Sequence, residues 1–416
     1  MAIVALLGTL DTKGIEYGWL RKRLLAAGVE VLLIDAGVIG EPRVPADVPR
    51  EAVAAAAGLD LARLRAAGDR GAAVTAMAEG AERTVLRLHA EGRLHALLAI
   101  GGSGGTSIAT RAMRALPLGV PKLMVSSMAC GDVTSYIGAS DITMMYSVVD
   151  IAGINRISAP VLANAADAAA GMARGFARNP PPAVFGTGGR PLVAASMAGV
   201  TTAGVDAARE RLTELGYEVL VFHSSGSGGR TLESLAGEGH FAGVLDLTLS
   251  EVADHLCGGL LGSGAGRLTA AGRRGVPQVV SLGALDMVKF GPPHTVPEHL
   301  RGPERRMRVH NPSVTVIRTT RSECRRLGRE VADKLRAAVG PTAVCVPLRG
   351  LSTLGRPGGP YHDPDADRAL FGALRDGLSG GRTELIEFDT HINDPAFGRA
   401  AAQRLHHMIA TVAPAA

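Results

Sequence analysis

Two glycine- and threonine-rich segments, each placed directly after an apolar run, are the residues of the first half best suited to chemistry. Residues 101–106 read GGSGGT after the run 96–100, and residues 8–14 read GTLDTKG after the run 1–7. A strand, a glycine loop and a helix in succession present backbone N–H groups to an anion. Taken singly, either segment is equally typical of a tight strand-to-helix turn. Because both would lie at the carboxyl edge of one parallel sheet, we expect a nucleotide-phosphate site there, with Lys13 neutralising charge.

Neither segment has the GxGxxG or the GxxxxGK(S/T) spacing, so a general motif search identifies no nucleotide. A third polar segment, residues 126–135 (SSMACGDVTS), also follows an apolar run. Its Asp132 suits Mg²⁺ or a ribose hydroxyl, and equally suits the cap of a following helix. We expect Cys130 in the same segment to be a small buried thiol.

The second half carries its own glycine-rich segment, residues 223–231 (HSSGSGGRT), after the apolar run 219–222. Its backbone donors and its arginine would suit a carboxylate or a phosphate, so we expect an acidic substrate there. The residues assigned to this substrate are Ser225, Gly226, Ser227, Gly228, Gly229 and Arg230.

Histidines and aspartates gather near predicted strand ends of the second half, as they do in general acid–base sites. The candidates are His223, Asp246, Asp286 and His391. A histidine in a loop is also commonly a surface or hydrogen-bonded residue. Ser352 lacks a GxSxG elbow, so a hydrolase triad is unsupported, and no HxxxH or CxxC spacing indicates structural zinc.

Apolar runs and glycine positions predict the elements that would hold these residues. The first half predicts strands near 2–8, 30–35, 95–100 and 121–126, helical segments over 47–92 with breaks at Gly58 and Gly68, and a helix over 163–177, with 141–149 ambiguous. The second half predicts strands near 192–197, 218–223, 243–249, 277–282, 314–318, 342–347 and 383–388, and a long loop over 291–312.

The two halves repeat one pattern of strand, polar loop, amphipathic helix, glycine and strand. Gly28 and Gly216 occupy matching positions after the helix, where a C-terminal glycine belongs. Strands that alternate with helices imply parallel sheets, so we predict an α/β protein. We expect two lobes, residues 1–180 and 190–416, joined near the proline-rich residues 179–182.

Composition excludes several classes of partner. The 416 residues are 46% hydrophobic but only 3% aromatic, which argues against base-stacking recognition of nucleic acid. The net charge is +5, and the arginine clusters are short, so no nucleic-acid partner is expected. No apolar run reaches about 18 residues, no signal-peptide layout opens the chain, and the four cysteines are isolated. We therefore expect a cytoplasmic protein without a membrane segment.

Longer blocks of sequence resemble the Tm-one-like ATP-binding family, which includes the N-terminal part of a plant tobamovirus-resistance protein. The blocks are residues 8–14 with Glu16, 101–106, 127–133, 140–155, 223–230, 243–248, 283–288 and 310–312. The chain departs from the pattern at Cys130, where serine is expected, and at Ala203, where proline is expected. The first departure alters a polar group near the expected ligand, and the second changes only the stiffness of a turn.

The resemblance implies two Rossmann-like lobes, ATP bound by the first lobe, and a homodimer or larger assembly. It assigns the nucleotide contacts to Asp11, Thr12, Lys13, Gly101, Gly102, Ser103, Gly104, Gly105 and Thr106, with Ser127, Gly131, Asp132 and Asp141 as further candidates. It implies no settled reaction.

These observations give the hypothesis of an ATP-binding, Mg²⁺-dependent enzyme that acts on a small acidic metabolite. Two alternatives belong to other classes. One is a lyase or hydrolase that does not use ATP and performs its chemistry in the second lobe. The other is a binding module in which ATP is a structural or regulatory ligand. The motifs identify no metal ligands and do not distinguish ATP hydrolysis, phosphoryl transfer and simple binding.

Overall fold

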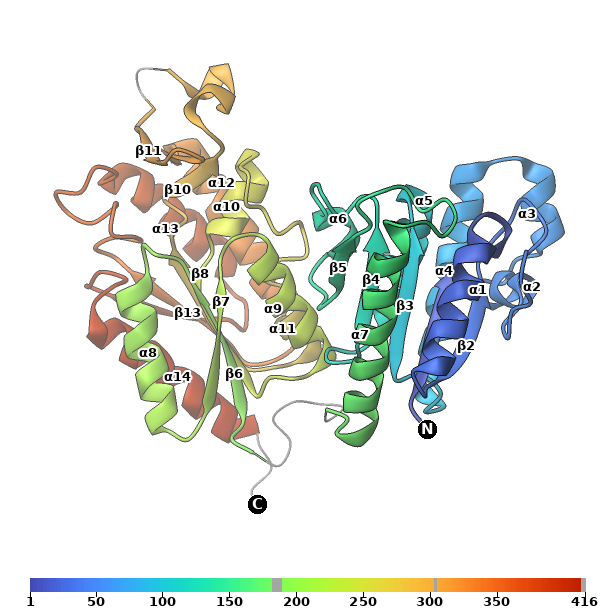
Figure 1. The fold of residues 1–416 in the computed structure, drawn as a ribbon. Coiled ribbons are helices and arrows are strands. Elements are labelled where there is room, and N and C mark those ends of the chain that lie inside the picture. The colour runs from blue at the N-terminus through green and yellow to red at the C-terminus, as the bar shows by residue number, and fades with distance from the viewer. Residues whose placement is uncertain (182–188, 303–304, 413–416) are drawn as a thin grey trace. The chain divides into compact units, whose positions relative to one another are not determined.

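The computed structural model describes residues 1–181, 189–302 and 305–412, and the chain forms two compact units, residues 1–183 and 184–416 (Figure 1). Of the expected linker, Pro182 lies outside the described residues. Within the described part of the chain, no helix combines the length and apolarity needed to cross a membrane.

The first unit is built on a five-stranded sheet in the order β2-β1-β3-β4-β5, in which all neighbours are parallel. The strands are β1 (Ile3–Gly8), β2 (Glu30–Asp35), β3 (Ala96–Gly101), β4 (Lys122–Ser126) and β5 (Thr143–Tyr146). The helices are α1 (Leu10–Ala26), α2 (Arg50–Ala56), α3 (Leu61–Ala67), α4 (Arg70–Ala90), α5 (Ser103–Ala115), α6 (Thr134–Ile137) and α7 (Ser158–Arg178). Gly58 and Gly68 adopt positive φ where the predicted breaks separate α2, α3 and α4.

Helices cover both faces of this sheet, so its strands read as continuous apolar runs. Leu6 of β1 packs in the cluster that includes residues of α1 and α7, whereas its neighbour Leu7 packs in the cluster of α4 and α5. The Tyr17 hydroxyl of α1 donates to Leu7 O (2.5 Å) and accepts from Ile100 N (2.9 Å). A Cβ on Gly8 would lie 2.0 Å from the Tyr17 ring, so glycine is required where β1 turns into α1.

The second unit has a six-stranded parallel sheet, β14-β13-β9-β8-β6-β7, and a three-stranded antiparallel sheet, β10-β12-β11. The strands are β6 (Leu192–Met197), β7 (Glu218–His223), β8 (Gly243–Thr248), β9 (Gln278–Gly283), β10 (Met287–Phe290), β11 (Met307–Asn311), β12 (Val314–Arg318), β13 (Thr342–Pro347) and β14 (Glu384–Phe388). The helices are α8 (Thr202–Glu214), α9 (Ser227–Glu238), α10 (Ser250–Cys257), α11 (Ala270–Arg274), α12 (Arg321–Arg336), α13 (Pro364–Leu378) and α14 (Pro395–Val412), with short 3-10 turns at Pro293–Thr295 and Glu298–Leu300.

One sequence prediction here needs correction. The segment 291–312 is not a single loop, because its last residues form β11 against β12. Polar and charged side chains hid this strand, since all five residues of β11 are exposed.

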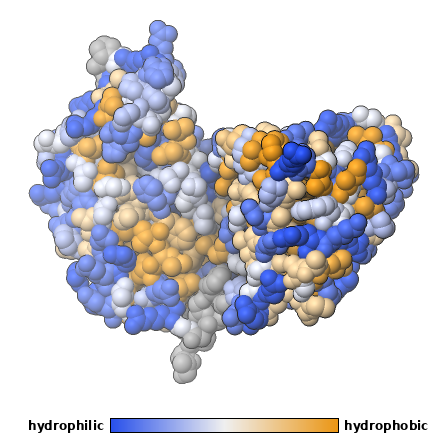
Figure 2. Space-filling model, viewed as in Figure 1, coloured by the Kyte–Doolittle hydropathy of each residue, from blue (hydrophilic) through white to orange (hydrophobic). Residues whose placement is uncertain are grey.

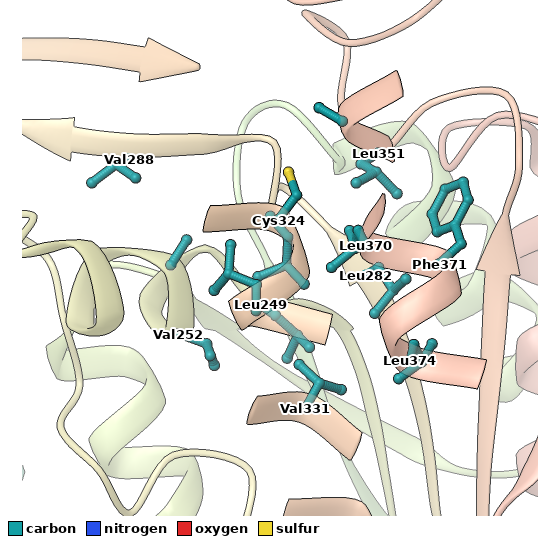
Figure 3. Close-up of a cluster of buried hydrophobic side chains, with 14 of the residues drawn as sticks. Leu249, Val252, Leu282, Val288, Cys324, Val331, Leu351, Leu370, Phe371 and Leu374 are labelled. Carbon is teal, nitrogen blue, oxygen red and sulfur yellow. The ribbon is translucent and has the colours of Figure 1, made fainter. Parts of the chain in front are cut away.

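The core of the second unit on one face of its large sheet is formed by β9, β13, α10, α12 and α13. Figure 3 shows this cluster, which includes Cys324, Phe371 and, from the loop after β13, Leu351.

Cys130 is exposed, contrary to the expected buried thiol, and all four cysteines are free. Figure 2 shows apolar residues gathering over β7, whose residues from Val219 to Phe222 are only half-buried.

Both units are therefore Rossmann-like α/β folds with mostly parallel sheets. In each, the first strand lies between the second and the third, so the order reverses between β1 and β3 and between β6 and β8. Ligands of open α/β sheets bind at the carboxyl ends of the strands beside such a reversal point.

Candidate functional site

A cavity of about 410 Å³ lies at the reversal point of the first unit. The loop after β1 and the loop after β3 form its polar wall. Residues from the loop after β2 and from helices α4 and α5 complete the lining. Its lining is Thr9, Asp11, Thr12, Lys13, Ala36, Val38, Ile39, Arg70, Ala73, Val74, Gly101, Gly102, Ser103, Gly104, Gly105 and Ile108. This volume is in the range of small-molecule and cofactor sites.

The N-terminus of α5 opens into this cavity. Gly102 is the N-cap residue and supplies no side-chain cap, and the first backbone bond runs from Thr106 N to Gly102 O (2.9 Å). Within residues 1–181, 189–302 and 305–412, no acceptor meets the N–H groups of Ser103, Gly104 or Gly105. Three free donors at the positive end of a helix form an anion-binding site.

Two cations flank these donors. Lys13 donates one hydrogen bond to Ile151 O, which leaves two of its three ammonium donors for a ligand. Arg70, the first residue of α4, has a guanidinium nitrogen 3.9 Å from the position that a Cβ on Gly104 would occupy. Sequence reasoning missed Arg70, because only the folded sheet brings the start of α4 beside the loop after β3.

Two carboxylates lie at the same edge, and they differ in role. Asp35 Oδ1 accepts from Leu10 N (3.0 Å) and Gly37 N (2.8 Å), so it holds the start of α1; burial and the nearby Asp11 raise its pKa. Asp11 Oδ2 accepts from Ile39 N (2.9 Å), whereas its buried Oδ1 has no partner in the described structure. Asp11 lines the cavity and Asp35 does not, so Asp11 is the carboxylate placed to meet a ligand there.

Five of the predicted nucleotide contacts do not line the cavity, namely Thr106, Ser127, Gly131, Asp132 and Asp141. Thr106 is fully buried behind the loop, where its hydroxyl meets Ser126 Oγ at 2.6 Å. Ser127 Oγ lies close, 3.7 Å from the position of a Cβ on Gly102, but Ser127 does not line the cavity. Gly131 and Asp132 are exposed, and hydrogen bonds from the Thr134 side chain and from Thr134 N (2.9 Å) hold the pKa of Asp132 below its usual value. Asp132 thus acts as the turn residue that starts α6.

Among the predicted nucleotide contacts, Asp141 lies farthest from its expected place, at the other edge of the sheet. Its carboxylate accepts from Lys122 Nζ (2.5 Å) and from Gly119 N (2.8 Å). Lys122 is the first residue of β4, so Asp141 lies at the amino edge of the sheet, opposite the cavity. The expected nucleotide role of Asp141 is corrected accordingly to an ion pair at that edge.

The glycine-rich loop of the second unit is filled by a carboxylate of the chain itself. Glu251 Oε1 accepts from Gly226 N (2.7 Å) and Gly229 N (2.9 Å). A Cβ on Gly229 would lie 2.0 Å from Glu251 Oε2. Arg230 donates to Gly262 O (3.3 Å), and Ser225 Oγ donates to His223 O (3.3 Å). The expected substrate loop, Ser225 to Arg230, is therefore corrected to a loop in which the N–H groups of Gly226 and Gly229 already hold a carboxylate of the chain.

Asp246 is likewise a structural carboxylate. It accepts a bidentate pair of hydrogen bonds from Arg267 and a further one from Ser196 Oγ (2.6 Å). Thr201 Oγ1 and Thr248 Oγ1 lie 2.8 Å apart beside it. These contacts close the reversal point of the second sheet, and they remove Asp246 from the acid–base candidates. His223 stays exposed, with Nδ1 3.1 Å from Met197 O.

Asp286 and His391 both hold the loop after β13. Asp286 is buried, which raises its pKa, and it accepts from Ser352 Oγ (2.5 Å). His391 Nε2 donates to Ser352 O (2.8 Å). Their roles are thus corrected from acid–base catalysis to positioning of this loop, which the sequence did not single out.

No group of three His, Cys, Asp or Glu in the part of the chain that the structure describes is arranged to hold a metal ion.

Asp254 of α10 is a buried titratable group that sequence reasoning missed. Its Oδ1 accepts from Lys289 N (2.6 Å), and its Oδ2 lies 3.5 Å from Lys289 Nζ. Burial raises its pKa from 3.8 to about 6, although Lys289 opposes the shift. A carboxyl whose pKa is higher in the folded state binds its proton more tightly there, so its contribution to stability falls as pH rises from about 4 to about 6.

Asp254→Asn is expected to remove this dependence, because the amide keeps the Oδ1 acceptor and carries no charge. Relative to the wild type, the variant should gain about 2–3 kcal/mol in free energy of unfolding between pH 4 and pH 7. Urea denaturation at both pH values measures the gain. A difference between variant and wild type that does not change with pH would contradict the shifted pKa.

Known relatives match the chain along most of its length. Residues 2–178 match the N-terminal domain, and residues 190–409 the C-terminal domain, of Uncharacterised protein family (UPF0261). A UPF0261 protein from Clostridium tetani is 43% identical over 98% of this chain and 98% of its own length. ToMV resistance protein Tm-1 from Solanum lycopersicum is 41% identical over 80% of this chain and 44% of its own length. The tomato match confirms the resemblance inferred from the sequence blocks.

One of the solved structures that match gives only a weak likeness. A Streptomyces glycosyltransferase, solved with thymidine diphosphate, matches with a TM-score of 0.17 and 14% identity, over 67% of this chain and 82% of its own. That likeness is too weak to bear on the fold or the ligand.

Proposed function

This chain belongs to the uncharacterised protein family UPF0261, and from that premise we propose that its first unit binds Mg²⁺-ATP and that the protein is an ATP-dependent enzyme acting on a small acidic metabolite. One observation carries the proposal: the free N–H groups of Ser103, Gly104 and Gly105 face a cavity at the reversal point of the first sheet. Phosphate is the ligand group that such donors favour.

The lining of the cavity offers both polar groups for phosphates and apolar side chains for a base. The glycine loop, Lys13 and Arg70 would hold and neutralise the phosphates. Apolar side chains form the rest of the lining and would pack against the base. They are Ala36, Val38, Ile39, Ala73, Val74 and Ile108. An apolar wall with a few convergent polar groups is typical of cofactor sites.

The Mg²⁺ part of the proposal rests on Asp11. Mg²⁺ beside nucleotide phosphates is commonly held by one or two carboxylates and by water, and Asp11 Oδ1 is the unpartnered carboxylate oxygen at this cavity. When bound, the ion would supply charge neutralisation to the phosphates.

Asp11→Asn should therefore weaken ATP binding about ten-fold in the presence of Mg²⁺ and leave binding without Mg²⁺ nearly unchanged. The amide oxygen can still accept from Ile39 N, so the fold should be kept. Calorimetric titration of both proteins with and without Mg²⁺ measures the difference. Equal Mg²⁺ dependence in the variant and the wild type would remove Asp11 as the ligand.

The enzymatic part is tested by incubating the protein with ATP and a panel of small carboxylic acids, with ADP and AMP as the readout. Acid-dependent release of either product supports an enzyme, and its absence across the panel favours a module in which ATP is regulatory. A lyase or hydrolase independent of ATP is less well supported, because three of its four candidate residues, Asp246, Asp286 and His391, are engaged in structural contacts and only His223 stays exposed. A cytoplasmic location and a homodimer remain part of the proposal; sedimentation analysis tests the latter.

A further inference from the structure

We propose that a second cavity, at the carboxyl ends of β13 and β14, binds a small molecule through a carboxylate or phosphate group. The site belongs to the second unit, and its ligand would bind without ATP. The cavity has a volume of about 520 Å³. Its lining is Arg349, Thr353, Arg356, Pro357, His391, Asn393, Asp394 and Pro395.

The loop that carries Thr353 and Arg356 is held in place by contacts with the core of the second unit. Gly350 has φ +130°, a conformation that other residues rarely adopt, and Leu351 is buried in the core cluster (Figure 3). The Ser352 hydroxyl donates to Asp286 and accepts from Leu354 N (3.1 Å) and Gly355 N (3.0 Å). A loop held at consecutive residues presents its outward side chains in one arrangement, as a binding site requires.

The opposite wall is fixed by hydrogen bonds as well. His391 Nε2 donates to Ser352 O (2.8 Å), and its Nδ1 accepts from Asn393 N (3.1 Å). Asn393 Nδ2 donates to Val200 O (2.9 Å), which also accepts from Thr353 N (3.0 Å). The loops after β6, β13 and β14 are thereby joined around the cavity.

The charges at the cavity favour an anion. Arg349 holds Asp389 through two hydrogen bonds of 2.6 Å, so a guanidinium at this rim already binds a carboxylate. That pair is exposed and therefore weak, so a ligand can replace it. The carboxylate of Asp394 accepts from Ala396 N (2.8 Å) and caps α14.

Arg356 is the cation in the cavity lining that is available to a ligand. Among the described residues, its exposed guanidinium has no hydrogen bond and no ion pair. The N-terminus of α14 also lies in the cavity wall, at Pro395, but Asp394 already caps it. The two guanidinium groups of Arg349 and Arg356 are therefore the groups that favour the oxygens of a carboxylate or phosphate.

The experiment titrates the full chain carrying Gly104→Val, so that the first cavity is blocked, with inorganic phosphate and with succinate at constant ionic strength. Saturable binding of either probe is expected, and the one that binds identifies the ligand group. Arg356→Gln in the same background should weaken that binding about ten-fold. Arg382→Gln, an exposed arginine at the amino end of β14, is the matched control and should bind as its parent does.

Thermal unfolding of the three proteins should agree within about 1 °C, because the exposed Arg356 side chain forms no hydrogen bond or ion pair with the described residues. Binding that is unchanged by Arg356→Gln would overturn the proposal. So would the absence of saturable binding of both probes. Neither result would affect the ATP proposal, because the first cavity is blocked in every protein of this series.

Discussion

Replacing Gly104 by valine is expected to abolish ATP binding while the fold survives. Gly104 is the second residue of α5, and a Cβ there would have Arg70 as its nearest neighbour, at an ordinary contact distance of 3.9 Å. The backbone can therefore accept a side chain, but the valine methyl groups would enter the space in front of the free N–H groups. The Kd for ATP should rise about 100-fold or more, which corresponds to about 2.7 kcal/mol.

Gly171→Val is the matched control for this change. Gly171 lies on the exposed side of α7 with open space around its Cβ position. Both variants should unfold within about 1 kcal/mol of the wild type, since neither side chain displaces the core. Wild-type ATP affinity in Gly104→Val would remove the α5 N-terminus from the phosphate site, whatever ligand the cavity holds.

Arg267→Met is expected to be strongly destabilising. The guanidinium of Arg267 is 1% exposed and pairs with Asp246, Glu251 (2.8 Å) and Glu233 (3.2 Å). Methionine fills similar space, but it leaves the buried carboxylates of Asp246 and Glu251 without a cation. Removing one partner from a buried ion cluster costs about 3–5 kcal/mol, a large part of the stability of a typical domain.

Arg368→Met provides the comparison, because Arg368 pairs with Asp365 while both side chains are about 70% exposed. That exposed pair should contribute less than about 1 kcal/mol. Chemical denaturation of both variants measures the two losses. Equal losses would show that the cluster around Arg267 is not what holds the 223–231 loop in place.

Strands and the first cavity could be predicted because their signals are local. Apolar runs located β1 and β3, and a parallel sheet must bring the loops that follow them to one edge. The convergence of Asp11, Lys13 and the glycine loop on one cavity follows from that rule.

The glycine-rich loop of the second unit shows where local signals fail. Its sequence is the same whether its N–H groups hold a substrate or the carboxylate of Glu251, 22 residues beyond Gly229. Only the tertiary structure, in which the turn from β8 to α10 places Glu251 beside this loop, shows that the carboxylate of Glu251 binds there rather than a substrate. The predicted nucleotide role of Asp141 was wrong for a related reason, because the sequence left the structure of residues 141–149 ambiguous. Since β5 starts at Thr143, Asp141 precedes this strand and lies at the amino edge of the sheet, away from the cavity.

Arg70 and Arg356 gave no signal at all. Each is one arginine among many in the sequence, and its position beside a cavity depends on elements far away in the chain. Such residues are assigned by tertiary structure, whereas the loops they face are assigned by sequence.

Calorimetric titration of the wild-type protein with ATP, with and without Mg²⁺, tests the central claim most directly. Saturable binding in the micromolar range, tightened by Mg²⁺, is the predicted result. An absence of ATP binding under both conditions would contradict the claim and would leave the first cavity to another anionic ligand.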